Sequence, residues 1–156
     1  MTIAGVTRDL PLFEIKPGVR IAILNILGDT ELVEAAAQEL AELLHTYELE
    51  ILVTAEAKAI PIAHALSVVM KIPYVVLRKN YKVYMGEALR SETLSITTGE
   101  PQTLILDEKD RVIVKGKRVA LVDDVISSGQ SARAGVALLA RAGTRPVAVA
   151  VAMAQG

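Results

Sequence analysis

Two adjacent carboxylates, Asp123 and Asp124, follow an apolar run at Val119–Val122 and precede a hydroxyl-rich stretch at Ser127–Ser131. The backbone N–H groups and hydroxyls of such a stretch, at the start of a helix, are suited to holding a monophosphate. The carboxylates repel a phosphate, so they require a partner with hydroxyl groups or a metal ion. A sugar phosphate satisfies both parts of the segment, with the loop on its phosphate and the acidic pair on vicinal hydroxyls. The alternative is a loop that only caps the following helix.

Four short apolar runs predict buried strands. They are Ile51–Thr54, Tyr74–Leu77, Val119–Val122 and Val147–Ala152. Strands that are apolar on both faces and alternate with helices indicate a parallel sheet flanked by helices, which is an α/β fold. Ligands of such sheets bind beyond the carboxyl ends of the strands, and the acidic pair directly follows the predicted strand Val119–Val122.

Three helices are predicted from their apolar faces and end signals. They cover Glu31–Leu44, Ile62–Val69 and Ser131–Ala142. Asp29 and Thr30 are N-cap candidates for the first helix. Pro61 suits the first turn of the second helix, and Gly143 stands where the third should stop.

The alternation of strands and helices breaks between Lys79 and Gly116. Leu94–Thr97 and Thr103–Leu106 are predicted as two strands that are joined around Gly99, Glu100 and Pro101. The stretch Asn80–Ser91 has no clear periodicity, and long irregular segments of this kind are often functional lids. A flexible β-hairpin lid over residues 80–106 is therefore expected.

Composition narrows the classes of function. The chain has 156 residues, of which 52% are hydrophobic, and this predicts a single globular domain. Its net charge of -1 and the lack of a basic block argue against nucleic acid as a partner. Without cysteine, disulfides and thiolate chemistry are excluded, and His45 and His64 lack the spacing of metal ligands. With neither a targeting segment nor a membrane span, we expect a cytoplasmic protein without a membrane partner.

The segment Val119–Ser131 resembles the 5-phosphoribosyl-1-pyrophosphate (PRPP) signature of the type I phosphoribosyltransferases. In that family the loop is usually of the type Thr-Gly-Gly-Thr, whereas here it reads Ser128-Gly129-Gln130-Ser131, with two hydroxyls kept and the second glycine lost. A receiver domain of a response regulator also carries an acidic pair, but that pair follows the first strand. Here the pair comes at Asp123, with one predicted strand left after it, so the order is wrong for a receiver domain.

Two more segments support the resemblance, which covers residues 29–152. Ile51–Pro61 is similar to the family's pyrophosphate loop, with Lys58 between strand and helix. Arg78–Lys82 is similar to the Arg-Lys-x-x-Lys run of adenine and related purine enzymes, which meets pyrophosphate, often across a dimer interface. Neither segment is specific alone. A strand-to-helix turn with one lysine is common, and the side chains of a basic turn often face water without binding a ligand.

The resemblance implies transfer of the phosphoribosyl group of PRPP to a purine base, which yields the nucleoside monophosphate and pyrophosphate. Mg²⁺ is implied as a cofactor that is held mainly by PRPP, and a homodimer is implied as the assembly. The catalytic residues it implies are Asp123, Asp124 and Lys82. The 5′-phosphate would bind to Ser127, Ser128, Gly129, Gln130 and Ser131. The pyrophosphate would bind to Ala57, Lys58, Ala59, Arg78, Lys79 and Lys82.

The base is the least determined part of the expected reaction. An N-terminal hood at residues 1–28 should cover it, over a core at residues 29–156, with Leu24, Asn25 and Val125 as base-binding candidates. Leu24-Asn25 resembles the hood of bacterial xanthine enzymes, but those carry a lysine after the last strand, where this chain reads Met153–Gly156. Adenine is favoured. The alternatives are xanthine or another 6-oxopurine, or a non-catalytic regulatory protein that binds PRPP.

Overall fold

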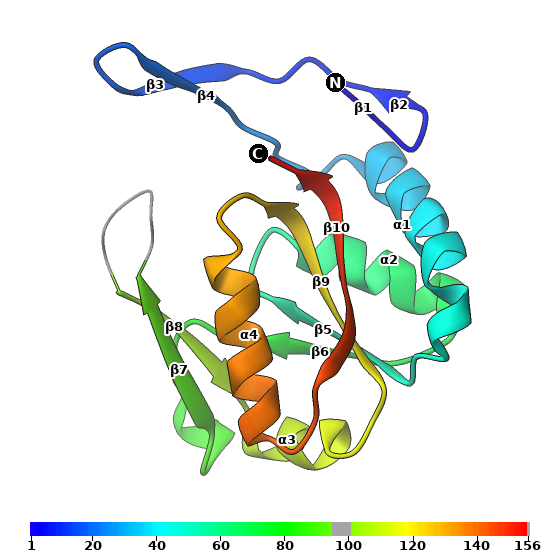
Figure 1. Ribbon diagram of the computed structural model, residues 1–156, viewed down its shortest axis with the longest axis vertical. Helices are drawn as coiled ribbons and strands as arrows, with labels where there is room; N and C mark the ends of the chain where they lie inside the picture. Colours follow the sequence, from blue (N-terminus) through cyan, green and yellow to red (C-terminus); the bar gives the residue numbers. More distant parts are fainter. Residues whose placement is uncertain (95–100, 156) are drawn as a thin grey trace.

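The computed structural model describes residues 1–94 and 101–155, and its centre is a four-stranded parallel sheet. The strands are β5 (Ile51–Ala55), β6 (Tyr74–Leu77), β9 (Val119–Ile126) and β10 (Pro146–Ala154), in the order β10-β9-β5-β6. Helices α1 (Thr30–Leu44) and α2 (Ile60–Met70) cover one face, and α4 (Gln130–Arg141) covers the other (Figure 1). The predicted α/β fold with a parallel sheet flanked by helices is confirmed.

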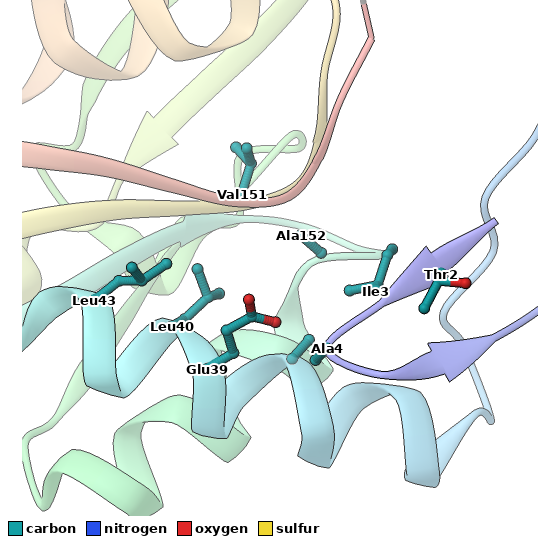
Figure 2. A pocket seen from close by; sticks show the side chains of 9 residues that line it. Thr2, Ile3, Ala4, Glu39, Leu40, Leu43, Val151 and Ala152 are labelled. Atoms are coloured by element: carbon teal, nitrogen blue, oxygen red, sulfur yellow. The ribbon is translucent and has the colours of Figure 1, made fainter.

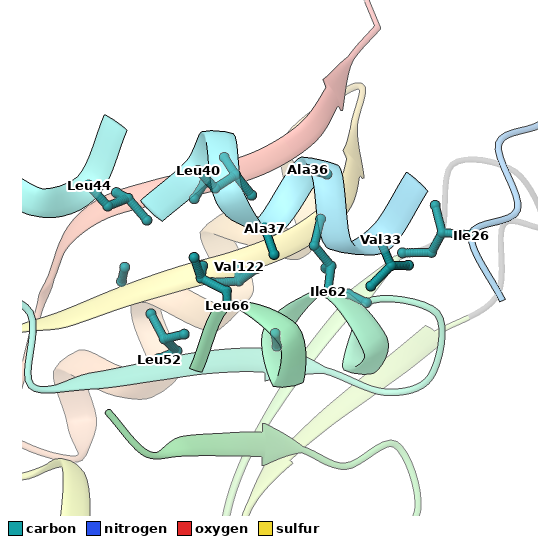
Figure 3. Packing of buried hydrophobic residues seen from close by; sticks show 14 of the residues in the cluster. Ile26, Val33, Ala36, Ala37, Leu40, Leu44, Leu52, Ile62, Leu66 and Val122 are labelled. Atoms are coloured by element: carbon teal, nitrogen blue, oxygen red, sulfur yellow. The ribbon is translucent and has the colours of Figure 1, made fainter. Parts of the chain in front are cut away.

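The sheet is apolar on both faces because successive side chains point to opposite sides. Leu52 and Val122 pack with Ile62 and Leu66 of α2, beneath α1 (Figure 3). Their neighbours on β5 and β9 belong instead to a second cluster with α4. Two helical layers therefore fix the direction and register of the strands that end at the acidic pair.

The three predicted helices are confirmed, with ends shifted by one or two residues. Asp29 caps α1, since its carboxylate accepts a hydrogen bond from the Leu32 N–H at 3.2 Å. Pro61 lies in the first turn of α2, where a missing N–H costs nothing. Gly143 follows α4 with a φ of 86°, a left-handed conformation that favours glycine.

The predicted end of the third strand at Val122 is wrong. β9 continues through Asp123 and Asp124 to Ile126. The physical reason is the long last strand: β5 pairs with β9 only as far as Val122, but β10 pairs with it to the end. The acidic pair thus stands on the last part of a strand rather than in a loop.

The segment between the second and third core strands is more regular than its sequence suggests. Strands β7 (Leu89–Leu94) and β8 (Pro101–Leu106) form an antiparallel hairpin, so the second predicted strand is confirmed. The first predicted strand shares only Leu94 with β7, and its other residues and the turn at Gly99 and Glu100 lie outside the described residues. Asn80–Ser91 holds a short 3-10 helix, η2 (Val83–Met85), and the start of β7.

Helix α3 (Glu108–Val114) has no counterpart among the predicted elements. The sequence feature that could have indicated this helix is Asp107, an N-cap residue directly before Glu108. In the structure the Asp107 carboxylate accepts a hydrogen bond from the Lys109 N–H at 3.0 Å. At seven residues the helix is too short for a clear periodicity. A second 3-10 turn, η1 (His45–Tyr47), extends α1.

Residues 80–91 are attached to α3 by several contacts. A Cβ at Gly86 would collide with the Glu108 carboxylate, which also accepts a hydrogen bond from the Glu87 N–H at 3.0 Å. The Arg111 guanidinium donates to the Glu87 carbonyl at 2.7 Å, and Met85 is buried. The mobility expected of this part of the lid stays a prediction, and these contacts oppose it.

The N-terminal residues form two small hairpins, β1 (Thr2–Ile3) with β2 (Val6–Thr7) and β3 (Leu12–Lys16) with β4 (Val19–Ala22). Arg8 holds this region to α1, because its guanidinium donates to both carboxylate oxygens of Asp29, at 2.7 and 2.9 Å. The β3–β4 hairpin extends away from this clamp beyond the end of β10 (Figure 1). Every residue of β3 is exposed, so this hairpin is only weakly held.

The β1–β2 turn closes a small cavity of about 230 Å³ against α1 and β10 (Figure 2). Glu39 is the one ionisable side chain among its lining residues, and the others shown are apolar or hydroxyl-bearing. This cavity therefore lacks the grouped functional side chains that chemistry requires. Across the described part of the chain, no helix has the length and apolar character that a bilayer crossing needs.

Candidate active site

A larger cavity of about 570 Å³ lies where β5 and β9 end, at the carboxyl edge of the sheet. It is lined by the end of β4 and the chain after it, the end of β5 and the turn after it, Lys79 after β6, and strand β8. The end of β9, the loop and first turn of α4 that follow it, and the end of β10 with the chain after it complete the lining. The lining residues are Ile21, Ala22, Ile23, Leu24, Ala55, Glu56, Ala57, Lys58, Ala59, Lys79, Gln102, Leu104, Asp123, Asp124, Val125, Ser127, Ser131, Met153 and Gln155. Ten of the residues predicted from sequence are among them.

The acidic pair lines this cavity from the last part of β9. Asp124 is buried, and its N–H donates to the Asp123 carboxylate at 2.9 Å. Burial raises the pKa of Asp123 to about 7, and the hydrogen bond and charge of the Asp124 carboxyl add to the shift. The Asp124 N–H and the Lys79 ammonium act in the opposite direction. Two ionised carboxylates are thus costly here without a partner, so a hydroxyl donor or a cation would be bound favourably.

The loop after β9 and the first turn of α4 present two hydroxyl-bearing residues to the cavity, Ser127 and Ser131. Gly129 is the N-cap residue of α4 with a φ of 73°, and no side chain caps this helix. The first N–H groups of α4 are therefore open to an anion. Ser128 in the loop and Gln130, the first residue of α4, do not line the cavity, and the Gln130 N–H lies 3.5 Å from the Ser128 hydroxyl.

The turn after β5 brings Ala57, Lys58 and Ala59 to the same cavity. Thr54 sets its position, since the Thr54 hydroxyl donates to the Val122 carbonyl at 2.8 Å and so ties β5 to β9. The peptide bond between Glu56 and Ala57 is cis. Lys58 and the acidic pair, which are far apart in the chain, line one cavity.

The basic residues of the segment Arg78–Lys82 do not all reach the cavity. Lys79 lines the cavity, but the Arg78 guanidinium donates to the Glu56 carboxylate at 2.9 Å and lies along a different cavity. Burial alone would raise the pKa of Glu56, yet the Lys79 N–H and the Arg78 guanidinium together hold this pKa below its usual value. Lys82 is exposed in the chain before η2 and is not among the lining residues.

Of the three predicted base-binding residues, two line the cavity and one does not. Leu24 and Val125 line the cavity. Asn25 does not: its side-chain carbonyl accepts a hydrogen bond from the Leu27 N–H at 3.2 Å, and the residue lines a neighbouring cavity.

Several lining residues carried no chemical signal in the sequence. They are Ile21, Ala22, Ile23, Ala55, Glu56, Gln102, Leu104, Met153 and Gln155. Met153 and Gln155 could have been predicted from their position, because they lie at the end of the last strand, at the edge where ligands of parallel sheets bind. The residues from β4 and β8 could be placed only through tertiary structure.

Comparison with known proteins agrees with this architecture. A family described as the phosphoribosyl transferase domain matches residues 24–156. The chain is 36% identical over 117 residues to a hypoxanthine/guanine phosphoribosyltransferase of Methanococcus maripaludis, which spans 75% of this chain and 59% of the relative. It is 35% identical over 127 residues to a xanthine phosphoribosyltransferase of Chloroflexus aurantiacus, with 81% and 59% covered. The chain thus spans little more than half the length of these curated relatives.

A third relative has a different role. The purine biosynthesis repressor PurR of Bacillus subtilis is 26% identical over 125 residues, which cover 80% of this chain and 43% of the repressor. Enzymes and regulators are therefore both found among proteins of similar sequence.

Solved structures share the fold. The adenine phosphoribosyltransferase of Giardia lamblia, in complex with 9-deazaadenine, has a TM-score of 0.75 at 14% identity, with 94% of each chain covered. That of Thermoanaerobacter pseudethanolicus has a TM-score of 0.74 at 20% identity, with 91% of this chain and 81% of the other covered. From its parallel sheet, its loop between β9 and α4 and the match over residues 24–156, the chain belongs to the phosphoribosyltransferase family, with the type I fold.

Proposed function

We propose that this chain transfers the 5-phosphoribosyl group of PRPP to a purine base. The observation that carries the proposal is one cavity of about 570 Å³ that joins the acidic pair, two serine hydroxyls at the start of an uncapped helix, and two lysines. The acidic pair is suited to the ribose hydroxyls of PRPP, the serine hydroxyls and helix start to its 5′-phosphate, and the lysines to its pyrophosphate. Belonging to the family supports the same reaction.

In this reaction the bond from the ribose C1 to pyrophosphate breaks and a bond from C1 to a ring nitrogen of the base forms. Asp123 and Asp124 would orient the ribose hydroxyls and favour the positive charge that develops on the sugar. Lys58 and Lys79 would stabilise the negative charge on the departing pyrophosphate. Ser127 and Ser131, with the open N–H groups of α4, would hold the 5′-phosphate.

Mg²⁺ fits this site only together with the substrate. In residues 1–94 and 101–155, no three or more His, Cys, Asp or Glu side chains are grouped to hold a metal ion. Mg²⁺ accepts one or two carboxylates and takes its remaining ligands from phosphates and water. Asp123 and Asp124 would hold an ion that PRPP brings, and the ion would neutralise charge on the pyrophosphate.

Two predicted pyrophosphate residues, Arg78 and Lys82, lie outside this cavity. Next to Lys82, the side chains of the adjacent residues Val83 and Tyr84 are 89% and 72% exposed, and neighbouring exposed apolar side chains can mark a protein contact. We propose that the chain acts as a homodimer in which this surface is covered and Lys82 approaches pyrophosphate. Sedimentation of wild type beside Tyr84→Asp tests it: a dimer that Tyr84→Asp leaves intact would place the contact elsewhere.

The class of purine is the finer part of the proposal. The curated relatives at 35% and 36% identity act on 6-oxopurines, and they support that class. The adenine enzymes are similar in fold at 14% and 20% identity, which does not carry a substrate assignment. The preference for adenine from sequence stays a prediction.

A regulator that binds PRPP without turning it over is the second candidate. The similarity to PurR favours it, as does Gln130 at the position of the usual second glycine of the loop. One set of measurements separates the candidates: PRPP affinity by calorimetry, and pyrophosphate release with adenine, hypoxanthine, guanine and xanthine. Release with at least one base supports the enzyme. PRPP binding without release supports the regulator, and no PRPP binding contradicts both.

A further inference from the structure

A cavity of about 550 Å³ lies at the amino edge of the parallel sheet. It is lined by α3 and the residue after it, by the end of α4 and the two residues after it, and by Glu87 before β7. β9 and β10 are parallel, and they begin at Val119 and Pro146, a few residues after α3 and α4 end. The cavity is thus far from the candidate active site, which lies where these strands end (Figure 1).

Positive side chains outnumber negative ones in the lining of this cavity. Arg111, Lys115 and Arg141 are its cations, and Glu87 and Glu108 are its carboxylates. One carboxylate is already engaged, since Glu108 accepts a hydrogen bond from the Glu87 N–H at 3.0 Å. In the part of the chain that the structure describes, no ion pair includes any of these three cations. An anion that enters the cavity would therefore meet cations without an ionic partner.

The surrounding sequence adds to this positive charge. Between positions 111 and 145 the chain contains seven lysine and arginine residues, while the acidic residues of this stretch are Asp123 and Asp124. Both of these lie on the last part of β9 and line the candidate active site. The two ends of β9 therefore differ in charge, and the end near α3 attracts anions.

The two guanidiniums are positioned by uncharged acceptors. The Arg111 guanidinium donates to the Glu87 carbonyl at 2.7 Å, and the Arg141 guanidinium donates to the Arg90 carbonyl. A carbonyl orients a guanidinium without neutralising it. Each guanidinium has five N–H donors, so most of them remain for a ligand.

Lys115 is positioned by the chain that follows α4. The Gly116 N–H donates to the Gly143 carbonyl at 3.2 Å, which ties the residues after α3 to those after α4. A Cβ at Gly143 would lie 3.2 Å from the Lys115 Cγ, so the stem of the lysine lies against this glycine. The fold thus brings an ammonium and two guanidiniums to one cavity before any ligand arrives.

We propose that this cavity binds a phosphate-bearing anion, with Arg111, Lys115 and Arg141 as its ligands. Phosphate suits the cations because a guanidinium donates two parallel hydrogen bonds to its oxygens and an ammonium adds a point charge. The volume lies within the range of small-molecule sites, about 300–1,000 Å³. This site is separate from the one proposed for PRPP, and the two cavities share no lining residue.

The alternative is that the cations only offset the negative ends of the helix dipoles. Arg111 and Arg141 lie in the last turns of α3 and α4, where such an effect is expected. That role needs no ligand, and it predicts that substitution changes stability to the same extent with and without phosphate. A phosphate site predicts a loss of affinity for phosphate itself.

Titration of the ¹⁵N-labelled chain with inorganic phosphate tests the proposal, with ionic strength held constant by sodium chloride. Saturable shifts are expected at the amide resonances of Lys115 and Gly143. Lys115→Gln and Arg141→Gln should each raise the Kd at these amides by about tenfold, the effect of one lost charge-assisted contact. Arg133→Gln is the matched control and should change this Kd by less than about twofold, because Arg133 lies on α4 without lining the cavity.

The same spectra separate this site from the proposed PRPP site. Ser127→Ala with Ser131→Ala should leave the Kd at the Lys115 and Gly143 amides unchanged, even where it weakens phosphate binding at the start of α4. Titration with AMP then distinguishes a free phosphate ion from the phosphate group of a nucleotide, since the better ligand saturates these amides at the lower concentration.

Two results would overturn the proposal. Shifts at these amides that do not saturate would mean that phosphate acts only on the overall charge of the protein. An equal loss of affinity in Arg133→Gln and Arg141→Gln would mean the same. Neither result bears on PRPP binding, which is measured at the other edge of the sheet.

Discussion

The acidic side of the candidate active site stands on the end of β9, which β10 pairs to its last residue and β5 pairs as far as Val122, whereas much of the apolar side (residues 21–24, Val125 and Met153) stands on a hairpin. β9 pairs with β5 and β10 and is packed between helices on both faces. Among the residues that the structure describes, β4 pairs only with the exposed strand β3, and Gln155 follows the last strand. The proposed PRPP side is therefore positioned before any ligand arrives, while the proposed base side has few contacts of its own.

This difference has an energetic meaning. A preorganised site stabilises charge without reorganising during the reaction, which suits the part that must meet a developing positive charge. A weakly held wall opens at low cost, which suits the part through which a flat base enters and leaves. We expect substitutions on the acidic side to affect turnover, and those on the apolar side to affect the choice of base.

The largest effect is expected at the acidic pair. Asp123→Asn and Asp124→Asn should each lower kcat by roughly 10²-fold or more, by analogy with the loss of one preorganised electrostatic contact. Without ligand, the thermal stability of both variants should equal or exceed that of the wild type, because a repulsion is removed. Steady-state kinetics and calorimetry measure the two quantities, with Glu34→Gln on the exposed face of α1 as the control. Normal turnover with a large loss of stability would assign the pair to the fold.

The next effect concerns the loop before α4. Ser127→Ala with Ser131→Ala should weaken PRPP binding by roughly 10²-fold or more, since each hydrogen bond to a charged phosphate contributes about 1.5–3 kcal/mol. Ser128→Ala should have a smaller effect, because Ser128 does not line the cavity. Titration calorimetry with PRPP and Mg²⁺ compares them. An effect of Ser128→Ala as large as that of the double variant would mean that the loop changes conformation on binding.

A smaller effect distinguishes the two lysines of the basic run. Lys79→Ala should lower kcat by about tenfold, the effect of a partly exposed charge on the leaving group, and should lower it more than Lys82→Ala does. The reason is that Lys79 lines the cavity and Lys82 does not. Parallel kinetics of the two variants provide the check. A larger loss at Lys82 would support movement of residues 80–91 or a contribution across a dimer interface.

The smallest effect is on stability and depends on pH. Asp123 has a usual pKa of 3.8 that rises to about 7 in the fold, so the folded chain binds this proton more tightly than the unfolded chain. Its contribution to stability is fully present below about pH 4 and is lost as the pH rises to about 7. The gain in stability of Asp123→Asn over the wild type should therefore grow across this range. Denaturant unfolding at several pH values measures it, and a gain that is constant with pH would refute the shifted pKa.

The sequence predicted best those parts of the site whose chemistry is local. The segment Val119–Ser131 contains its strand, carboxylates, hydroxyls and helix start in one stretch, and its position in the fold follows from the order of elements. The position of the Arg78 side chain could not be predicted in this way, because its guanidinium is held by Glu56, which lies 22 positions earlier in the chain. Gln155 meets Ala22 over a separation of 133 positions, and no local pattern indicates that contact.

The clamp between Arg8 and Asp29 links two events that would otherwise be independent. The Asp29 carboxylate caps α1 and also binds the Arg8 guanidinium, so the arginine and the Leu32 N–H both hold the pKa of Asp29 below its usual value. Release of the first residues would leave the helix cap without the group that orients it, and unwinding of the first turn would leave Arg8 without its anchor. The N-terminal strands and the first turn of α1 should thus exchange their amide hydrogens as one cooperative opening unit, although more than twenty residues separate them.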